Sequence, residues 1–130
     1  MHAVLNRDYL DHLPDPNLLD DYRKLILKVP DAKSDIIGLH LENALLEFYC
    51  KCGCHSFYVL PRNRATLPKL RDHNCVYKEI AYKTNYPEEL NVMLIIDEYG
   101  ILCQVTVFFG RDNLKVIPNN LIIGSIEGIW

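Results

Sequence analysis

The sequence lacks several features that would place it at once in a familiar class. It has no stretch near the roughly 18 consecutive apolar residues that a membrane-spanning helix needs. Its start lacks the basic residues and the apolar run of a secretory signal, and it contains no internal repeat or low-complexity tract. These absences favour a soluble protein of the cytoplasm. In that compartment we expect the five cysteines to be reduced.

An excess of basic charge is also missing. There are 14 Lys and Arg residues against 17 Asp and Glu, a net charge of −3, whereas nucleic-acid-binding domains usually carry a basic excess. We therefore expect no direct binding to nucleic acid. The charge is uneven: residues 1–47 hold five basic and nine acidic side chains (−4), residues 48–86 seven and two (+5), and residues 87–130 two and six (−4). Such segregation steers a charged partner only if folding keeps the charges in patches.

The composition that remains is that of an ordinary globular domain. The chain has 130 residues, of which 49% are hydrophobic and 24% charged, close to the average for folded domains. A chain of this length buries roughly two-thirds of its surface on folding, so a core forms without disulfides or metal. We predict one domain spanning residues 1–130.

Helical signals are concentrated near the N-terminus. Asp15 is a good N-cap and Pro16 suits the first helical position. Apolar side chains then recur at helical spacing, and Pro30 ends the pattern. The recurring residues are Leu18, Leu19, Tyr22, Leu25, Ile26 and Val29. This pattern predicts a helix over residues 16–28. A shorter helical segment is expected around 5–13. Residues 31–42 are ambiguous, with Ser34 as a candidate cap of a further short helix.

The rest of the chain has the character of β-strands. We predict strands at 44–51, 56–60, 75–84, 90–96 and 101–109, with Gly100 in a hairpin turn and a polar loop over 62–74. Successive strands without crossover helices favour a mainly antiparallel sheet, so we predict an α+β fold with N-terminal helices packed on that sheet. Residues 114–130 hold only short apolar pieces. These pieces, including Ile122, Ile129 and Trp130, either complete the core or dock on a partner.

Cys50, Cys52 and Cys54, followed by His73 and Cys75, form the most distinctive group of potential ligands. Structural zinc sites usually space their first thiols by two to four residues, and here the spacing is one. On a strand the first three thiols share a face, where cysteine packs like a small hydrophobe. We interpret them as core residues and expect no metal and no cofactor. A small zinc-binding regulatory or binding module is the alternative, and a reactive thiolate is a third possibility.

Other residue pairs do not indicate catalysis. Cys54 and His55 are adjacent, so on an extended strand they point to opposite faces. Asp97 and Glu98 lie in a predicted hairpin turn rather than in a cleft. The basic loop at 62–74 has no glycine-rich phosphate-binding segment beside it. We interpret the histidines as surface or incidental residues and Cys103 as a core residue on the face of Ile101, and we do not expect an enzyme.

Acidic and aromatic residues supply the candidate contacts with a partner. One group is on or beside the predicted helix and comprises Asp15, Asp20 and Asp21. The other is at the predicted hairpin turn, where Tyr99 follows Asp97 and Glu98, and an aromatic ring flanked by charges suits an interface. The alternative is that all six are ordinary solvated surface.

Two segments give a family resemblance. Residues 45–57, which contain Cys52-Gly53-Cys54 between two predicted strands, and the hairpin 90–109 resemble segments of small bacterial immunity proteins. These proteins belong to polymorphic toxin systems, including contact-dependent growth inhibition. In this chain residues 101–105 lack the acidic residue that is more usual there, and no functional residue is carried over.

The resemblance implies a small cytoplasmic α+β protein without catalytic residues. Its expected partner is a cognate protein toxin domain, bound one-to-one so that the toxin's active site is blocked, with no membrane involved. Many such toxins are nucleases with basic clefts, which acidic inhibitors reach rapidly.

Overall fold

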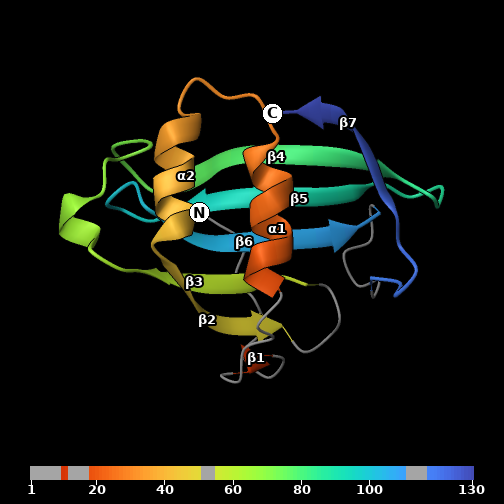
Figure 1. The fold of residues 1–130 in the computed structure, drawn as a ribbon, viewed down its shortest axis with the longest axis horizontal. Coiled ribbons are helices and arrows are strands. Elements are labelled where there is room, and N and C mark those ends of the chain that lie inside the picture. Colours follow the sequence, from red (N-terminus) through yellow and green to blue (C-terminus); the bar gives the residue numbers. More distant parts are fainter. Residues whose placement is uncertain (1–9, 12–17, 51–54, 111–116) are drawn as a thin grey trace.

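The computed structural model describes residues 10–11, 18–50, 55–110 and 117–130 (Figure 1). Within them, two α-helices and a single sheet confirm the predicted α+β class. The helices are α1 (Leu18–Leu27) and α2 (Ser34–Glu42). The strands are β1 (Leu10–Asp11), β2 (Ala44–Cys50), β3 (Phe57–Pro61), β4 (Cys75–Thr84), β5 (Leu90–Ile96), β6 (Leu102–Phe109) and β7 (Ile123–Ile129).

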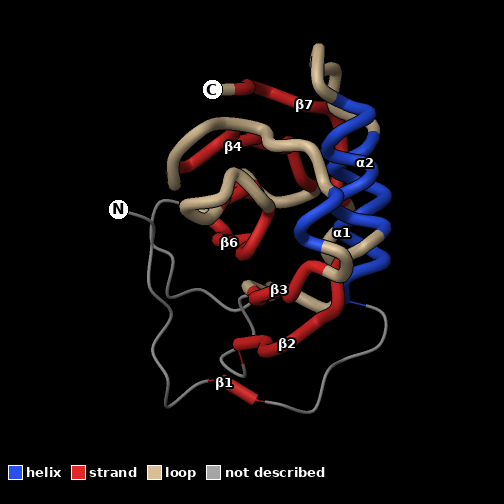
Figure 2. Tube along the Cα trace, turned by 90° about the vertical axis from the view of Figure 1, so that its left-hand side faces the viewer, coloured by secondary structure: helices blue, strands red, loops and turns tan. Residues whose placement is uncertain are grey.

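The seven described strands form an antiparallel sheet in the order β1-β2-β3-β6-β5-β4-β7. Both helices cover one face of it (Figure 2). Because β4, β5 and β6 form a meander that returns to β3, the chain leaves β3 and crosses the ends of β6 and β5 to reach β4. Residues 62–74, which include a short 3-10 helix at Arg64–Thr66, make this crossing. The crossing loop therefore lies at the same end of the sheet as the β5–β6 turn.

Helix α1 follows its sequence pattern closely. It ends at Leu27, one residue before the predicted boundary, and residues 16–17 lie outside the described part. Its apolar stripe is buried at Leu18, Leu19, Tyr22 and Ile26. Burial of each such side chain stabilises the fold by roughly 1.5–3 kcal/mol, which explains why this periodicity is a dependable signal.

Helix α2 resolves the ambiguous segment 31–42, but not in the way that Ser34 suggested. Lys33 occupies the N-cap position without a side-chain hydrogen bond, and Ser34 is already helical. Asp31 instead accepts a hydrogen bond from the Lys33 amide at 2.6 Å. The expected cap at Ser34 is wrong because Ser34 is itself the first helical residue, and the Asp31 carboxylate shapes the turn before the helix.

The predicted helical segment 5–13 is wrong at the two of its residues that the structure describes. Leu10 and Asp11 form β1, which pairs with Cys50 and Tyr49 of β2. The other residues of that segment lie outside the described ranges. β1 therefore pairs with the last two residues of β2 and covers only that end of the strand's outer edge.

Strand β7 is longer than the short apolar pieces expected there. Its isoleucines recur every three residues, which is not the strand period of two. Register shifts against β4 account for this, because each three-residue step along β7 matches a two-residue step along β4. The pairs are Ile129 with Ile80, Ile126 with Tyr82, and Ile123 with Thr84. Two irregularities thus bring three isoleucines to one face.

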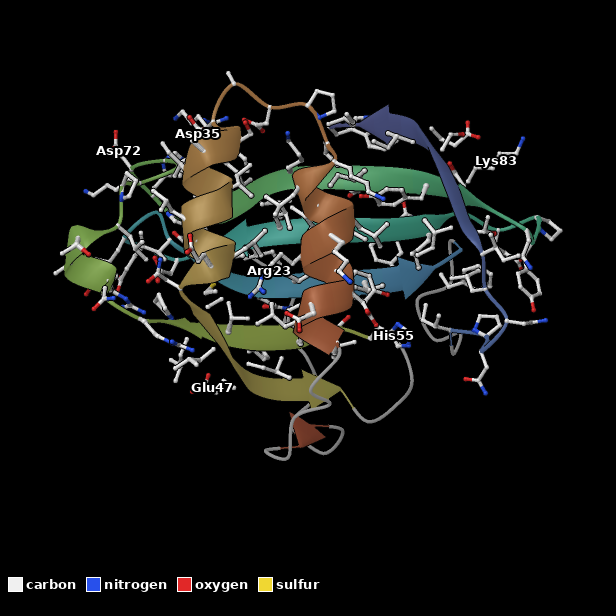
Figure 3. The ribbon with its side chains drawn as sticks, viewed as in Figure 1. Arg23, Asp35, Glu47, His55, Asp72 and Lys83 are labelled. Atoms are coloured by element: carbon white, nitrogen blue, oxygen red, sulfur yellow. The ribbon has the colours of Figure 1, made fainter. Side chains whose placement is uncertain are left out.

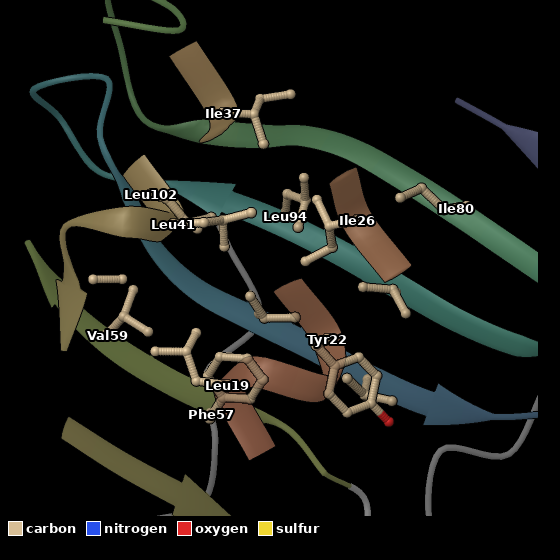
Figure 4. Packing of buried hydrophobic residues seen from close by; sticks show 14 of the residues in the cluster. Leu19, Tyr22, Ile26, Ile37, Leu41, Phe57, Val59, Ile80, Leu94 and Leu102 are labelled. Carbon is tan, nitrogen blue, oxygen red and sulfur yellow. The ribbon is translucent and has the colours of Figure 1, made fainter. Parts of the chain in front are cut away.

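The main core lies between the helices and the sheet (Figure 4). Tyr22 and Ile26 of α1 and Leu41 of α2 pack with strand residues such as Phe57 and Leu94, and all five are at most 4% exposed. The opposite face of the central strands is buried as well, as Ala81, Ile95 and Gln104 are 0–1% exposed and lie outside this cluster. None of the helices in the described ranges has the length and apolar character needed to cross a bilayer.

Candidate functional site

The predicted contact residues lie in two separate places. Asp20 and Asp21 are exposed on the first turn of α1, whereas Asp97, Glu98 and Tyr99 lie in the β5–β6 turn at the end of the sheet. Helix α2 lies between the two groups (Figure 1). Asp15 lies outside the described residues. The fold therefore does not join these residues into one surface patch, and their role in binding stays a prediction.

Asp97 is tied up by the hairpin itself. Its Oδ1 accepts hydrogen bonds from the amides of Tyr99 at 2.8 Å and Ile101 at 3.1 Å. Its Oδ2 lies 3.4 Å from Nη2 of Arg64, and the Asp97 side chain is only 18% exposed. The carboxylate thus shapes the turn, while Glu98 and Tyr99 remain exposed.

The basic loop at 62–74 packs against this turn. The Arg64 guanidinium lies 5.2 Å from the centre of the Tyr99 ring, and the Leu70 amide donates to the Gly100 carbonyl at 2.9 Å. Gly100 has φ +77°, and a Cβ there would lie 2.1 Å from the Arg71 carbonyl oxygen, so only glycine fits. Sequence blocks of opposite charge are therefore brought together, and Arg64 contacts both Asp97 and the Tyr99 ring.

His40 is a core residue, contrary to the expectation of surface or incidental histidines. It is 1% exposed, its Nε2 lies 2.6 Å from the Pro68 carbonyl, and its Nδ1 accepts from the Leu102 amide at 3.3 Å. A carbonyl can only accept, so the proton is on Nε2 and the ring is neutral. Burial lowers the pKa of His40, although the Pro68 hydrogen bond and the nearby Asp97 charge oppose this shift. His40 fastens α2 to both the crossing loop and β6.

A buried ion pair that sequence reasoning missed joins the α1–α2 connection to β4. Lys78 Nζ donates to Asp31 Oδ2, and the Tyr77 hydroxyl donates to Asp31 Oδ1 at 3.1 Å. The Lys78 and Asp31 side chains are 10% and 9% exposed. A register shift between Val76 and Lys78 is the reason that two neighbouring residues reach the same carboxylate.

The electrostatics of the Asp31–Lys78 pair are those of a structural ion pair that holds the α1–α2 connection against β4. Burial raises the pKa of Asp31, but hydrogen bonds from Lys78, the Lys33 amide and Tyr77, with the Lys78 charge, bring it below its ordinary value. Burial and the Asp31 contact raise the pKa of Tyr77. The Arg71 guanidinium covers the Tyr77 ring at 4.8 Å. Asp31, Lys78 and Tyr77 are therefore all engaged in contacts within this chain.

Tyr22 of α1 and His55, which is labelled in Figure 3, form a part-buried contact. The Tyr22 hydroxyl lies 2.8 Å from Nδ1 of His55, and the two rings meet edge to face with centroids 5.8 Å apart. They border a depression of about 420 Å³ that also includes Asp21, Lys24 and Leu121. The contact holds the start of the β3 segment against α1. The neighbouring Cys54 lies outside the described residues.

Two free thiols, Cys75 and Cys103, lie on described strands. Cys75 is half-buried and packs against the core. Cys103 is half-buried as the extra residue of a bulge between Leu102 and Gln104, and like Ile101 it lies outside the helix-facing cluster. Its Sγ donates to the Ile95 carbonyl at 3.5 Å, and burial raises the pKa of Cys103 to about 11. A thiol with such a pKa stays protonated at neutral pH.

The fold separates two members of the predicted ligand group. Strands β3, β6 and β5 lie between Cys50 on β2 and Cys75 on β4, a backbone separation of about 19 Å or more at ~4.8 Å per strand. A zinc ion bound about 2.3 Å from each sulfur does not bridge that gap. In the part of the chain that is described, no three His, Cys, Asp or Glu residues form a metal-binding group. Cys52 and Cys54 lie outside it.

An open groove runs between α1 and α2 on their outer side. It measures about 680 Å³ and is lined by Arg23, Leu27, Ser34, Asp35, Gly38, Leu39 and Glu42. Leu27 and Leu39 are 46% and 41% exposed, so two leucines face solvent across the groove. A Cβ on Gly38 would lie 3.7 Å from Cδ2 of Leu27, an ordinary contact. The fold therefore accommodates alanine at position 38. Glycine nevertheless occupies it, even though glycine is less favourable than alanine in a helix by about 1 kcal/mol.

The charges around this inter-helix groove are predominantly acidic. Arg23 is already used, because it donates to Asp20 at 2.8 Å and to the Leu41 carbonyl at 2.9 Å. Asp35 and Glu42 form no ion pair with any described residue. Exposed leucines flanked by uncompensated carboxylates suit a partner that is apolar along one stripe and basic beside it. Of the predicted contact residues, Asp20 lies next to this groove. Leu27, Leu39 and Gly38, which line the groove, were not predicted as contacts from the sequence.

Comparison with protein-family models, curated proteins and solved structures finds no match to this chain.

Proposed function

We propose that this chain is an immunity protein that binds a cognate bacterial toxin domain in the cytoplasm and blocks the toxin's active site. The resemblance of residues 45–57 and 90–109 supports a toxin as the partner. The observation that carries the binding role is the inter-helix groove, with Leu27 and Leu39 exposed and with Asp35 and Glu42 unpaired among the described residues.

The groove fits a protein segment better than a small molecule. It is open, and its lining mixes two exposed leucines with charged side chains from both helices. An amphipathic helix laid in such a groove places anchors at positions i, i+3, i+4 and i+7. A toxin with a basic cleft supplies the complementary charge, and attraction to Asp35 and Glu42 accelerates the encounter.

Co-expression with its toxin tests the proposed function directly. We expect the toxin to be the C-terminal region of a protein encoded immediately upstream of this chain, and that region is the probe. We expect the two proteins to co-purify one-to-one and the host to survive toxin expression only when this chain is present. A host that dies in its presence, or an upstream region of metabolic enzymes only, contradicts the proposal.

Paired leucine variants test the surface. Leu39→Lys removes an anchor and reverses the charge of the groove, and lysine suits both a helix and its C-terminal end. The matched control is Leu60→Lys on β3, at a leucine that is 46% exposed compared with 41% for Leu39. We expect Leu39→Lys to weaken toxin binding by about 2 kcal/mol, a typical loss for an interface anchor, and Leu60→Lys to leave it unchanged. Equal effects would exclude the groove while leaving the immunity function open to other surfaces.

A further inference from the structure

Strand β7 is an exposed edge with unusually little protection. It is the last strand in the described order and pairs only with β4 among the strands placed there. Ile122 and Trp130, which flank it, are 67% and 71% exposed, and Ile129 is 42% exposed. The strand has a single charged residue, Glu127, and no proline or lysine. Edge strands normally carry such residues because unpaired backbone groups recruit other strands.

The sequence of β7 is almost the same in both directions. Reading Ile-Gly-Ser-Ile-Glu-Gly-Ile from either end gives isoleucine at the ends and the centre and glycine next to each end. When two copies pair antiparallel about a two-fold axis at Ile126, Ile123 lies opposite the second copy's Ile129. Gly124 then lies opposite its Gly128, and Ser125 opposite its Glu127. No charge meets a like charge, and each isoleucine meets another isoleucine.

The faces of β7 agree with this register. Ile123, Ile126 and Ile129 share the helix-facing side because of the register shifts against β4. Those shifts fall on either side of Ile126, so a two-fold axis there relates one to the other. The isoleucine pairs of the two copies would therefore continue the core side of the sheet. Directly opposite side chains of this kind contact each other across antiparallel strands.

Trp130 lies on the other side of the sheet. Its backbone exchanges hydrogen bonds with Glu79 at 2.9 and 3.1 Å, and its ring covers Gly128, where an added Cβ would lie 2.6 Å from Cη2. Ile122 pairs through its backbone with Asn85 and flanks the opposite end of β7. In the two-fold register Ile122 falls opposite the second copy's Trp130. The two most exposed large apolar side chains of the described residues thereby become partners.

We propose that β7 pairs with β7 of a second copy of this chain, forming a two-fold symmetric dimer with one continuous sheet. Such an interface is self-complementary, as two-fold symmetry requires. None of the residues that line the inter-helix groove belongs to β7. The dimer therefore presents two inter-helix grooves, one on each copy. The proposal of a dimer does not depend on the toxin-binding role.

Charge substitutions at Ser125 test the register. Ser125 is exposed, so the monomer tolerates either sign. Ser125→Lys faces the second copy's Glu127 with opposite charge, and Ser125→Glu faces it with like charge, each twice in the dimer. We expect the lysine variant to dimerise about tenfold more tightly than the glutamate variant, with the native chain between them. Sedimentation velocity over a concentration series measures these constants.

Matched variants at Ser34, an exposed serine on α2, control for net charge alone. We expect Ser34→Lys and Ser34→Glu to dimerise equally. The proposal is overturned if the native chain stays monomeric at its highest soluble concentration, or if the two Ser125 variants behave alike.

Fluorescence supplies an independent readout because Trp130 is the only tryptophan. We expect its emission to shift to shorter wavelength as the native chain dimerises, and Ile122→Ser to weaken both the shift and the dimer. A dimer that forms without any change in tryptophan emission would use another surface and contradict this one.

Discussion

Two regions of this molecule are both rich in polar groups but differ in how those groups are used. The hairpin end comprises residues 62–74, the turn 97–101, His40 and the Asp31–Lys78 pair. There Asp97, Arg64, His40 and Asp31 each contact other groups of the same chain. On the outer helix face, Asp35 and Glu42 have no described ion-pair partner, and Leu27 and Leu39 face solvent.

The difference shows that residue type alone does not identify a binding surface. An acidic hairpin turn with a tyrosine is typical of an interface in the sequence, yet Asp97, one of its two carboxylates, serves the turn itself. A glycine and two leucines in helical segments attract no notice in the sequence, yet they form the open groove. Charge that the fold consumes contributes to stability, and charge that it leaves unpaired is available to a partner.

The sharpest way to break this comparison is to remove the buried carboxylate. Asp31→Asn leaves Lys78 buried without a counter-charge, and we expect a loss of about 3 kcal/mol in the free energy of unfolding, measured by urea denaturation. The control is Asp20→Asn, which breaks an exposed pair with Arg23 and should cost at most about 1 kcal/mol. Equal losses would mean that the two regions do not differ in this respect.

His40 gives the next largest effect and adds a pH dependence. His40→Ala leaves the Leu102 amide and the Pro68 carbonyl without their partner, at a cost of about 2 kcal/mol. Because the folded-state pKa of His40 is lowered, the unfolded chain binds more protons at acidic pH. Its contribution to stability is therefore complete above about pH 6.5 and is lost as the pH falls through the lowered folded-state value.

Denaturation at several pH values measures this contribution, with the exposed His73 replaced by alanine as the control. The native chain and the His73 variant should lose stability between neutral and mildly acidic pH more steeply than His40→Ala. Parallel pH profiles for all three proteins would show that His40 does not titrate in this way.

Gly38→Ala tests the outer helix face, where Gly38 lines the inter-helix groove. The added methyl group fits beside Leu27, so we expect a gain of about 1 kcal/mol in stability from helix propensity. The same methyl group raises the floor of the groove, so toxin binding should weaken although the fold is more stable. Calorimetric titration with the toxin domain decides, and undiminished binding would show that the partner does not approach Gly38.

The smallest effect is expected at Arg64. Arg64→Ala removes the contact with the Tyr99 ring and the partly exposed pair with Asp97, and should cost about 0.5–1 kcal/mol of stability. Toxin neutralisation should be unaffected because this arginine lies at the hairpin end. A variant that folds normally yet fails to protect the host would transfer the binding role to that end.

Elements stabilised mainly by their own pattern were the ones that sequence analysis located. The predicted bounds of β4 and β5 match the structure, and α1 ends within one residue of its prediction. Their apolar side chains follow the period of the element and are buried in one core. Strands β1 and β7 were missed because each depends on its neighbour. Leu10–Asp11 pairs with β2, and the three-residue spacing of β7 becomes a strand only through its irregular pairing with β4.

The candidate site also contains residues that the sequence pattern located and residues whose role depends on distant parts of the chain. Asp20 and Asp21 were placed correctly on an exposed helical turn, since amphipathic periodicity fixes which face is solvated. The groove could not be found from the sequence, because it exists only where two helices lie next to each other on the sheet. The buried roles of His40 and Lys78 likewise depend on partners 28 or more residues away in the chain.

The sequence by itself determined the α+β class, the buried stripe of α1 and the central antiparallel strands, because local periodicity dictates which side chains leave water. Only the tertiary structure decided which charges are consumed and which remain. Pairing across the sheet and packing between the helices bring together residues that are distant in the chain, and an ionic or apolar group is available to a partner only where that packing leaves it uncovered.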